Sequence, residues 1–221
     1  MEELWAHSVN GRGCRHGFVD HARSTARLAR WFAEPFGAGD VAFALGLLHD
    51  AGKVECAWQE RLLKAEVTGG RVGGAHWELG AKLLLRAADV GALAVFGHHR
   101  GLTRPGDIKE LRDRQTEDEN RTRERLFAAL PEARSLTTGP LLLPGAWLRR
   151  DWSALEVGLR LVFSALVDAD HLDTAAHFHG VTGPVLAEPV DMVSLLRRFE
   201  DRRGEWLAGR VGSAVDGCRA A

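Results

Sequence analysis

The dipeptide His49-Asp50 ends an apolar segment, and a lysine follows three positions after the aspartate. An imidazole and a carboxylate that are adjacent at a helix end can diverge and hold a pair of metal ions between them. The ammonium of Lys53, one turn further on, is then placed to meet a phosphate oxygen. The pattern L-L-H-D-x-G-K after an apolar helix therefore predicts a metal centre that acts on phosphate esters, with His49, Asp50 and Lys53 as candidate catalytic residues.

Further histidines lie on or beside apolar helical segments. At 100° per residue, His21 falls about 20° from Leu28 and His76 about 20° from Leu83, inside the apolar stripe in both cases. One such histidine alone is more often packed in a core than bound to a metal, but several on inward faces indicate a metal site. The histidines in such positions are His21, His49, His76, His98 and His99.

A carboxylate shares the apolar face of the long segment 155–176. Asp170 lies about 40° from Leu166 on that stripe, whereas Asp168 lies about 160° away from Asp170. A carboxylate that faces a core needs a strong partner, because burying it unpaired is costly. A metal ion is such a partner, and a buried arginine or a helix cap is the alternative.

The elements that position these residues are predicted to be helices, because nearly every periodic segment has helical spacing. Asp40 is a candidate N-cap for the helix 41–48, and Gly52 its stop. No run alternates as a strand would. The sequence predicts one all-α domain over 1–221, in which 100–125 is a charged loop, an exposed helix or a lid over the site. Helices are expected at 17–32, 41–48, 58–64, 76–88, 90–99, 155–176 and 189–207.

Composition narrows the class of protein. A net charge of −1 over 221 residues excludes a free-standing, strongly basic nucleic-acid coat protein. Three scattered cysteines favour reduced thiols in a cytoplasm over disulfides or a zinc–thiolate site. No apolar run approaches the roughly 18 residues that span a bilayer, and Met1-Glu2-Glu3 lacks the basic start of a signal peptide. We therefore expect a cytoplasmic protein without a membrane partner.

The ordered histidines and aspartates resemble the HD superfamily of phosphohydrolases. More narrowly, the chain is similar to the HD nuclease domain of the type I CRISPR-associated helicase-nuclease. Other matching stretches are 5–8, 47–53, 58–59 and 163–174. The runs most specific to that subfamily are His98-His99-Arg100-Gly101-Leu102 and Ser164-Ala165-Leu166-Val167-Asp168-Ala169-Asp170.

The resemblance implies an HD-domain helical bundle with a metal site in its core cleft, and a nuclease that acts on single-stranded DNA. It implies two divalent ions of Mn, Ni, Co or Fe, with Mg as a further option. Lys53 would be a cation on the phosphate side, and His7 of the A-H-S run receives no ligand role. The ligands of the first ion would be His21, His49, Asp50 and Asp170. The ligands of the second would be Asp50, His76, His98 and His99, with Asp50 bridging.

The same resemblance implies partners. In that family the nuclease is usually fused to a helicase with an ATP-binding P-loop, and it degrades the strand displaced by an RNA-guided CRISPR surveillance complex. No G-x-x-x-x-G-K-[ST] motif occurs in this sequence, and 211–221 resembles the lead into that helicase. We therefore expect a piece of a longer chain or a stand-alone nuclease subunit. Its expected partners are single-stranded DNA, a helicase domain or subunit, and the surveillance complex.

Two other functions use the same residues. An HD nucleotide phosphohydrolase would act on dNTPs, nucleoside monophosphates or cyclic nucleotides, and would turn over free nucleotides. A non-catalytic docking module would bind metal without turnover and lose stability on chelation. In the simplest alternative, the histidines only pack in an all-α domain and no metal binds.

Overall fold

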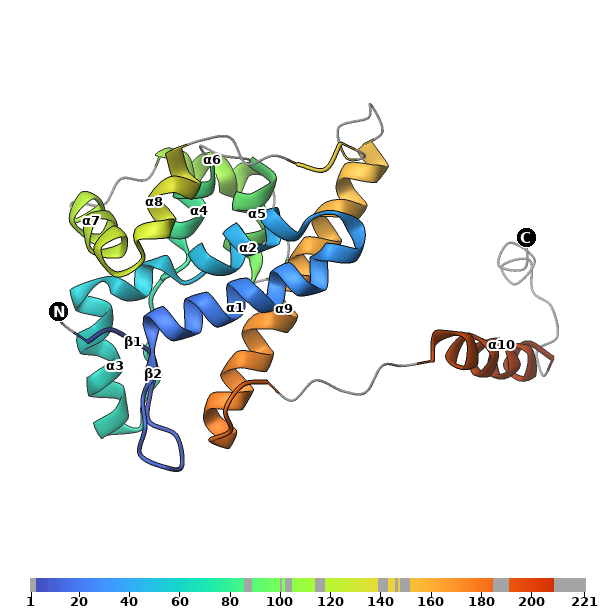
Figure 1. The fold of residues 1–221 in the computed structure, drawn as a ribbon, viewed down its shortest axis with the longest axis horizontal. Helices are drawn as coiled ribbons and strands as arrows, with labels where there is room; N and C mark the ends of the chain where they lie inside the picture. The colour runs from blue at the N-terminus through green and yellow to red at the C-terminus, as the bar shows by residue number, and fades with distance from the viewer. Residues whose placement is uncertain are drawn as a thin grey trace. The chain divides into compact units, whose positions relative to one another are not determined.

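Helices dominate the computed structural model, which describes residues 3–85, 89–99, 101, 105–113, 118–138, 143–145, 147, 152–184 and 191–208 (Figure 1). The first elements are β1 (Trp5–His7), β2 (His16–Gly17), α1 (Phe18–Ala33), η1 (Glu34–Phe36), α2 (Gly39–Leu48), η2 (Ala51–Val54) and α3 (Cys56–Thr68). They are followed by α4 (Glu78–Leu85), α5 (Asp89–Gly97), α6 (Pro105–Asp113), α7 (Glu119–Ala129), α8 (Pro131–Thr138), α9 (Trp152–His179) and α10 (Met192–Ala208). The predicted all-α class is confirmed.

The strands β1 and β2 were not predicted. They form a small antiparallel pair in which Trp5 faces Gly17 and His7 faces His16. Strands of two or three residues are too short to show the alternation that identifies a strand in a sequence. The pair places His7 and His16 at the N-terminal end of α1.

Helices α1, α2 and α9 pack against one another and form the centre of the core (Figure 1). The inward face of α1 carries alanines at helical spacing, so α2 can approach its backbone closely. A Cβ on Gly46 of α2 would lie only 2.6 Å from the Cα of Ala26, so only glycine fits at this crossing. The close crossing brings His21 of α1 next to His49 at the end of α2.

Several predicted boundaries change. Asp40 is not the N-cap of α2, because the helix begins at Gly39 and Ala38 is its cap. Asp40 lies in the first turn instead, where its carboxylate pairs with Arg30. The helix expected at 58–64 extends over Cys56–Thr68 and ends at Gly69 in the left-handed conformation. That conformation is available to glycine at little cost, which explains why the helix stops there.

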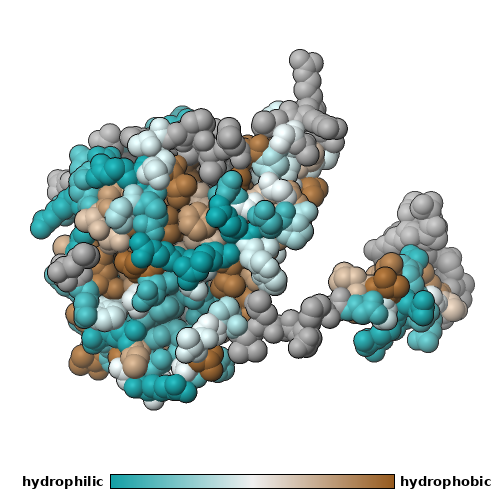
Figure 2. Space-filling model, in the orientation of Figure 1, coloured by the Kyte–Doolittle hydropathy of each residue, from teal (hydrophilic) through white to brown (hydrophobic). Residues whose placement is uncertain are grey.

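The chain divides into two compact units, Met1–Pro184 and Val185–Ala221. The described part of the second unit is α10, on which Figure 2 shows both hydrophobic and hydrophilic residues exposed. The expected single domain over 1–221 stays a prediction. In the charged region 100–125, the structure describes Gly101, α6, Asp118 and the start of α7, and a lid role is untested. The expected lead into a helicase at 211–221 lies outside the described residues.

No helix in the described ranges combines the length and apolar character that a membrane crossing needs.

Candidate metal centre

The end of α2 places two adjacent side chains in the interior. His49 is the C-cap residue of α2, and Asp50 precedes the turn η2. Both are buried. The imidazole of His49 donates its Nδ1 hydrogen to the carbonyl oxygen of Gly46 at 2.7 Å, because a carbonyl can only accept. The lone pair of its Nε2 is therefore left to face the interior.

Three further histidines repeat this arrangement. The Nδ1 of His21 lies 2.7 Å from the carboxylate of Asp173, the Nδ1 of His76 lies 3.2 Å from the carbonyl of Gly74, and that of His98 lies 2.6 Å from the carbonyl of Val95. An oxygen acceptor at Nδ1 fixes the tautomer and leaves Nε2 as a ligand atom, which is how metal-binding imidazoles are usually held.

The Nε2 atoms then meet at distances that demand a cation. The Nε2 atoms of His21 and His49 are 3.2 Å apart, and those of His76 and His99 are 2.8 Å apart. Two lone pairs at such distances repel each other unless a proton or a metal ion lies between them. The arrangement is therefore stable only with bound cations or with protonated imidazoles.

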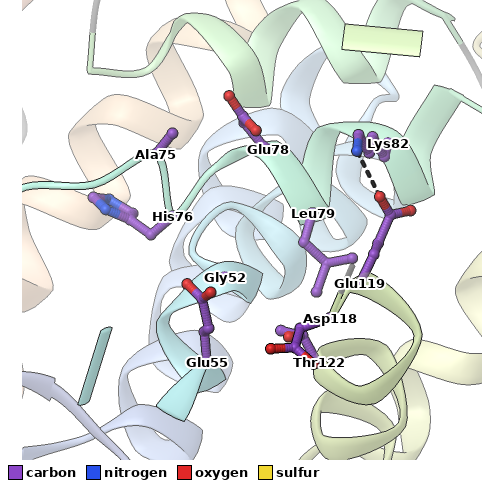
Figure 3. Close-up of a pocket in the computed structure, with 10 residues that line it drawn as sticks. All are labelled: Gly52, Glu55, Ala75, His76, Glu78, Leu79, Lys82, Asp118, Glu119 and Thr122. Atoms are coloured by element: carbon purple, nitrogen blue, oxygen red, sulfur yellow. Dashed lines mark hydrogen bonds and ion pairs between the residues drawn. The ribbon is translucent and has the colours of Figure 1, made fainter. Parts of the chain in front are cut away.

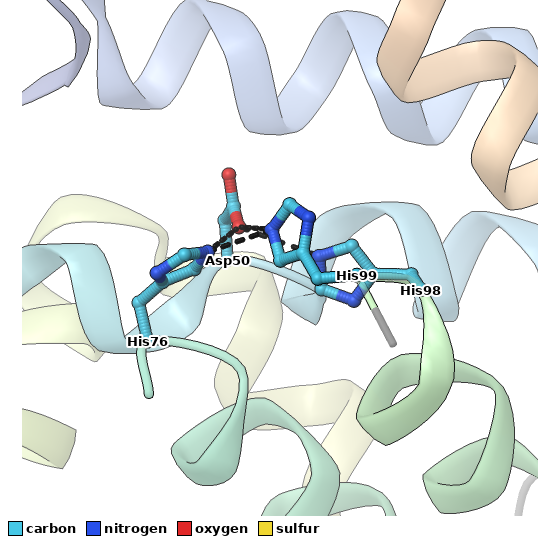
Figure 4. A group of neighbouring side chains, drawn as sticks. All are labelled: Asp50, His76, His98 and His99. Atoms are coloured by element: carbon cyan, nitrogen blue, oxygen red, sulfur yellow. Dashed lines mark hydrogen bonds and ion pairs between the residues drawn. The ribbon is translucent and has the colours of Figure 1, made fainter. Parts of the chain in front are cut away.

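Asp50 stands between the two pairs of histidines. One carboxylate oxygen, Oδ2, lies 3.3 Å from the Nε2 of His21 and 3.2 Å from that of His49. The other, Oδ1, lies 3.3 Å from the Nε2 of His76 and 3.7 Å from that of His98, and Figure 4 shows these side chains around it. A single carboxylate thus presents one oxygen to each half of the cluster.

The side chains form two sets that could each hold a metal ion, and within each set the ligand atoms lie within 4.8 Å of one another. The first set is His21, His49 and Asp170, and the second is Asp50, His76, His98 and His99. All the residues that the sequence singled out as metal ligands are therefore brought together. Asp170 lies 3.4 Å from the Nε2 of His21, whereas Asp168 is exposed and belongs to neither set.

Unsatisfied polar atoms support a metal at this place. The Oδ1 of Asp50 and the Nε2 of His98 are buried without a hydrogen-bond partner. Leaving such groups unpaired costs roughly 1–3 kcal/mol each, so a native fold rarely keeps them without a ligand. Imidazole nitrogens and carboxylate oxygens are the donors preferred by Zn, Mn, Fe, Co and Ni. The donor set and the orphaned atoms both fit divalent transition metals.

The remaining catalytic candidate, Lys53, is also at the centre. Its Nζ lies 2.5 Å from the Oδ2 of Asp50 and 5.5 Å from the centroid of the Trp58 ring, and the side chain is almost fully buried. Here the ammonium neutralises Asp50. Its predicted contact with a phosphate is untested and stays a prediction.

Electrostatics around the site follow from these contacts. Burial alone would lower the pKa of His49, but the carboxylates of Asp50 and Asp170 outweigh it and raise that pKa to about 10. Burial would raise the pKa of Asp50, yet the neighbouring His49 and Lys53 hold it well below the usual value. Without metal, the cluster therefore keeps a proton on His49 and a negative charge on Asp50.

The sequence analysis missed Asp173. This residue is buried on α9, and its Oδ2 binds the Nδ1 of His21 and lies 3.4 Å from the Nε2 of His16. Asp173 lies about 20° from Leu166 in helix phase, so the arithmetic that selected Asp170 would also have selected it. It orients His21 from outside the set of candidate ligands.

His7, to which the sequence gave no ligand role, lies in a second group of histidines. The ligand atoms of His7, His16 and His21 also lie within 4.8 Å of one another. Burial, followed by the nearby cation of Lys53, lowers the pKa of His7. Burial and the proximity of His21 lower the pKa of His16 to about 4. Both imidazoles are therefore neutral near pH 7. The short strands that carry them left no pattern by which this proximity could have been found.

Two pockets flank His76. Lys82, the lysine in the pocket of Figure 3, is paired with Glu119 at 2.5 Å. Figure 3 also shows the imidazole of His76 pointing away from the other lining side chains. The lining of this pocket is rich in carboxylates, which repel a phosphodiester, so the pocket does not suit a phosphodiester substrate. The other pocket has a volume of 400 Å³ and includes Lys53, His76 and His99 in its lining. The carboxylates that line the pocket of Figure 3 belong to Glu55, Glu78, Asp118 and Glu119.

The fold and the site define a class of helical domains in which histidine and aspartate sets could each hold a metal ion. Comparison with protein families is more specific, because the model of the HD domain matches residues 18–130. The chain belongs to the HD-domain family. The match includes His21, His49-Asp50, His76 and His98-His99, whereas Asp170 and Asp173 lie beyond it on α9. A search of curated proteins found no match. Membership of this family indicates a metal-dependent phosphohydrolase in general.

Proposed function

We propose that the protein is a metal-dependent nuclease that hydrolyses phosphodiester bonds of single-stranded DNA in type I CRISPR interference. The observation that carries the hydrolytic part is the position of Asp50, whose two oxygens face two histidine sets. The choice of substrate is supported by the subfamily runs 98–102 and 164–170, which resemble the nuclease domain of the helicase-nuclease.

Each candidate side chain has a part in this proposal. His21, His49, Asp50 and Asp170 would hold one divalent ion, and Asp50, His76, His98 and His99 would hold the other. Two such ions, when bound, supply an activated water and offset the charge on the scissile phosphate and its leaving oxygen. Asp173 keeps the Nε2 of His21 turned toward the site. Lys53, whose Nζ lies 2.5 Å from the Oδ2 of Asp50, would supply a positive charge to a phosphate oxygen.

The ligand chemistry favours particular ions. Magnesium prefers six oxygen ligands in octahedral geometry, whereas these sets are rich in imidazole nitrogen. Mn, Ni, Co or Fe therefore suit the site better, and Mg is the weaker candidate. We also propose that a helicase domain or subunit and the RNA-guided surveillance complex deliver the strand. With a net charge of −1, the chain has little general attraction for DNA, and its binding to isolated strands should be weak and salt-sensitive.

The test uses purified protein with linear and circular single-stranded DNA and Mn²⁺, Co²⁺ or Ni²⁺, beside duplex DNA and an Asp50→Ala control. We expect wild-type protein to degrade single-stranded DNA and the control to leave it intact; cutting of the circle would identify an endonuclease. If wild-type protein leaves both forms intact under all three metals, or the control cuts equally, these results would falsify the proposal.

One observation favours the nucleotide phosphohydrolase as a second candidate. The pocket that includes Lys53, His76 and His99 in its lining has a volume of 400 Å³, which is within the usual range for small-molecule sites, about 300–1,000 Å³. The same preparation should therefore be assayed with dNTPs, nucleoside monophosphates and cyclic nucleotides. Turnover of these compounds without cleavage of DNA would select this alternative, and metal binding without either activity would select a docking module.

A further inference from the structure

The 400 Å³ pocket next to the metal centre, called the cavity from here on, is built from β1, η2, α3 and the loop that leads into α4. Lys53, His76 and His99 line both the cavity and the candidate metal centre. None of the described residues that line the cavity is acidic, in contrast to the pocket of Figure 3. Its larger apolar lining residues are Trp58, Leu62, Val72 and Trp77.

Two indole rings are held against the imidazoles of the second metal set. The centroid of the Trp77 ring lies 5.2 Å from that of His76 and 5.8 Å from that of His99, in edge-to-face geometry. The Trp58 ring lies 6.0 Å from His76 in the same geometry. Trp58 is almost fully buried and packs inside the protein, whereas Trp77 is half-buried. A flat ligand that contacts Trp77 in this cavity would lie one ring away from the metal ligands.

The loop over this cavity is open and has a cation at its edge. Gly73 and Gly74 have φ values of 62° and 96°, a left-handed conformation that favours glycine, so no side chain covers the cavity there. A Cβ on Gly74 would lie 2.8 Å from the Nη2 of Arg61, which places an exposed guanidinium beside the loop. The same guanidinium lies 3.8 Å from a carboxylate oxygen of Glu55, so its charge is already paired, and Lys53 is the cation that lines the cavity itself.

We propose that this cavity holds the unpaired base of the nucleotide next to the scissile phosphate, stacked on Trp77, with Lys53 on the phosphate side. Aromatic side chains bind every base through its face, so such a site needs no particular sequence. A base inside a duplex cannot enter without leaving its stack and its partner. The cavity would thus be the source of preference for single strands. This inference rests on the proposed nuclease function and names its substrate-binding residue.

The first test compares Trp77→Ala and Trp77→Phe with wild type, and uses Trp31→Ala as a matched control. Trp31 is an exposed tryptophan of α1 that lines a different pocket. We expect Trp77→Ala to raise KM for a single-stranded oligonucleotide on the order of tenfold. Kd for the same oligonucleotide, measured by fluorescence anisotropy in EDTA, should increase to a similar extent. Trp77→Ala should also show a smaller preference for single-stranded over duplex DNA. The KM and Kd of Trp77→Phe should stay within about threefold of the wild-type values, and those of Trp31→Ala should equal them.

The second test changes the DNA, so it holds even if Trp77→Ala fails to fold. A single abasic nucleotide is moved along a single-stranded oligonucleotide, and cleavage is mapped at each bond. Wild-type protein should cut on the order of tenfold more slowly at the bond beside the abasic position, and Trp77→Ala should lose this difference.

The outcomes separate this inference from the function on which it rests. Cleavage by wild-type protein that is indifferent to abasic positions, or an unchanged KM in folded Trp77→Ala, refutes the base site and leaves the nuclease standing. Wild-type protein that cuts no single-stranded DNA overturns the proposed function and the base site together.

Discussion

Replacing Asp173 by asparagine should weaken metal binding although Asp173 is not itself a candidate ligand. Its Oδ2 accepts a hydrogen bond from the Nδ1 of His21 at 2.7 Å, and both side chains are buried. Burial would raise the pKa of this carboxyl, but the hydrogen bonds from His21 and Ser24 hold the pKa below its usual value. The group is therefore ionised at neutral pH, and asparagine removes that charge with little change in shape.

The expected size of the effect follows from the role of Asp173. Partners that orient a metal-bound imidazole typically contribute about 10- to 100-fold to metal affinity or activity. That range corresponds to roughly 1.4–2.7 kcal/mol of binding free energy. We expect a loss of this size for Mn²⁺ in Asp173→Asn, and the effect should fall on the ion held by His21, His49 and Asp170.

Isothermal titration calorimetry with Mn²⁺ measures this loss, and circular dichroism checks that the variant is folded. Asp168→Asn is the matched control, because Asp168 is an exposed aspartate of the same helix outside both ligand sets. A folded Asp173→Asn protein that binds Mn²⁺ as tightly as the Asp168→Asn control would refute the reasoning. A loss of thermal stability without a loss of affinity would show that Asp173 acts only on packing.

Three further perturbations address other parts of the centre. Gly52→Ala should destabilise the fold by about 1–3 kcal/mol in thermal unfolding and weaken Mn²⁺ binding, because a Cβ there would lie 2.4 Å from the carbonyl oxygen of His76. The control Gly106→Ala should have neither effect, because a Cβ at Gly106 would meet no atom within 4 Å. Lys53→Met should lower kcat/KM on DNA about 10- to 100-fold while Mn²⁺ affinity stays equal or rises, and a parallel loss of affinity would contradict the phosphate role. The raised pKa of His49, about 10, means that this residue stabilises the metal-free fold fully below pH ~6.5 and loses that contribution as pH rises toward 10. Mn²⁺ must displace the same proton, so affinity should increase from pH 6.5 to 8.5 while metal-free stability falls, and calorimetry with thermal melts at each pH would expose a trend of opposite sign.

Helix phase accounted for most of what could be predicted. The inward positions of His21 on α1 and Asp170 on α9 follow from spacing alone, because a helix repeats every 3.6 residues and its apolar face must point to the core. The helix expected at 76–88 begins at Glu78 instead, so His76 reaches the cluster from the turn before α4 and not through helix phase. The same rule distinguished Asp170 from Asp168, and the structure places Asp170 in the cluster. That these residues bind metal remains a prediction.

Other features depend on contacts between distant segments. Helix phase could have marked Asp173 as inward, but not its partner, because the pairing with His21 joins residues 152 positions apart. The contact of His7 with His16 depends on strands too short to form a pattern. Asp40 has the residue type of an N-cap, yet α2 begins at Gly39, two residues before the predicted start at 41, and the carboxylate of Asp40 pairs with Arg30 instead. Tertiary contacts therefore decided what propensity alone could not.

The carboxylate of Asp50 has a consequence for how such a centre can change over evolutionary time. On the two-metal proposal, one side chain serves both ions, so its loss removes a ligand from each in a single step. A longer glutamate would displace both oxygens together. A descendant that needs only one ion must therefore give up ligands after α5 and before α4, or the one on α9, and keep position 50. The two ligand sets can therefore be lost separately through their histidines or Asp170, but not through Asp50, which both sets share on this proposal.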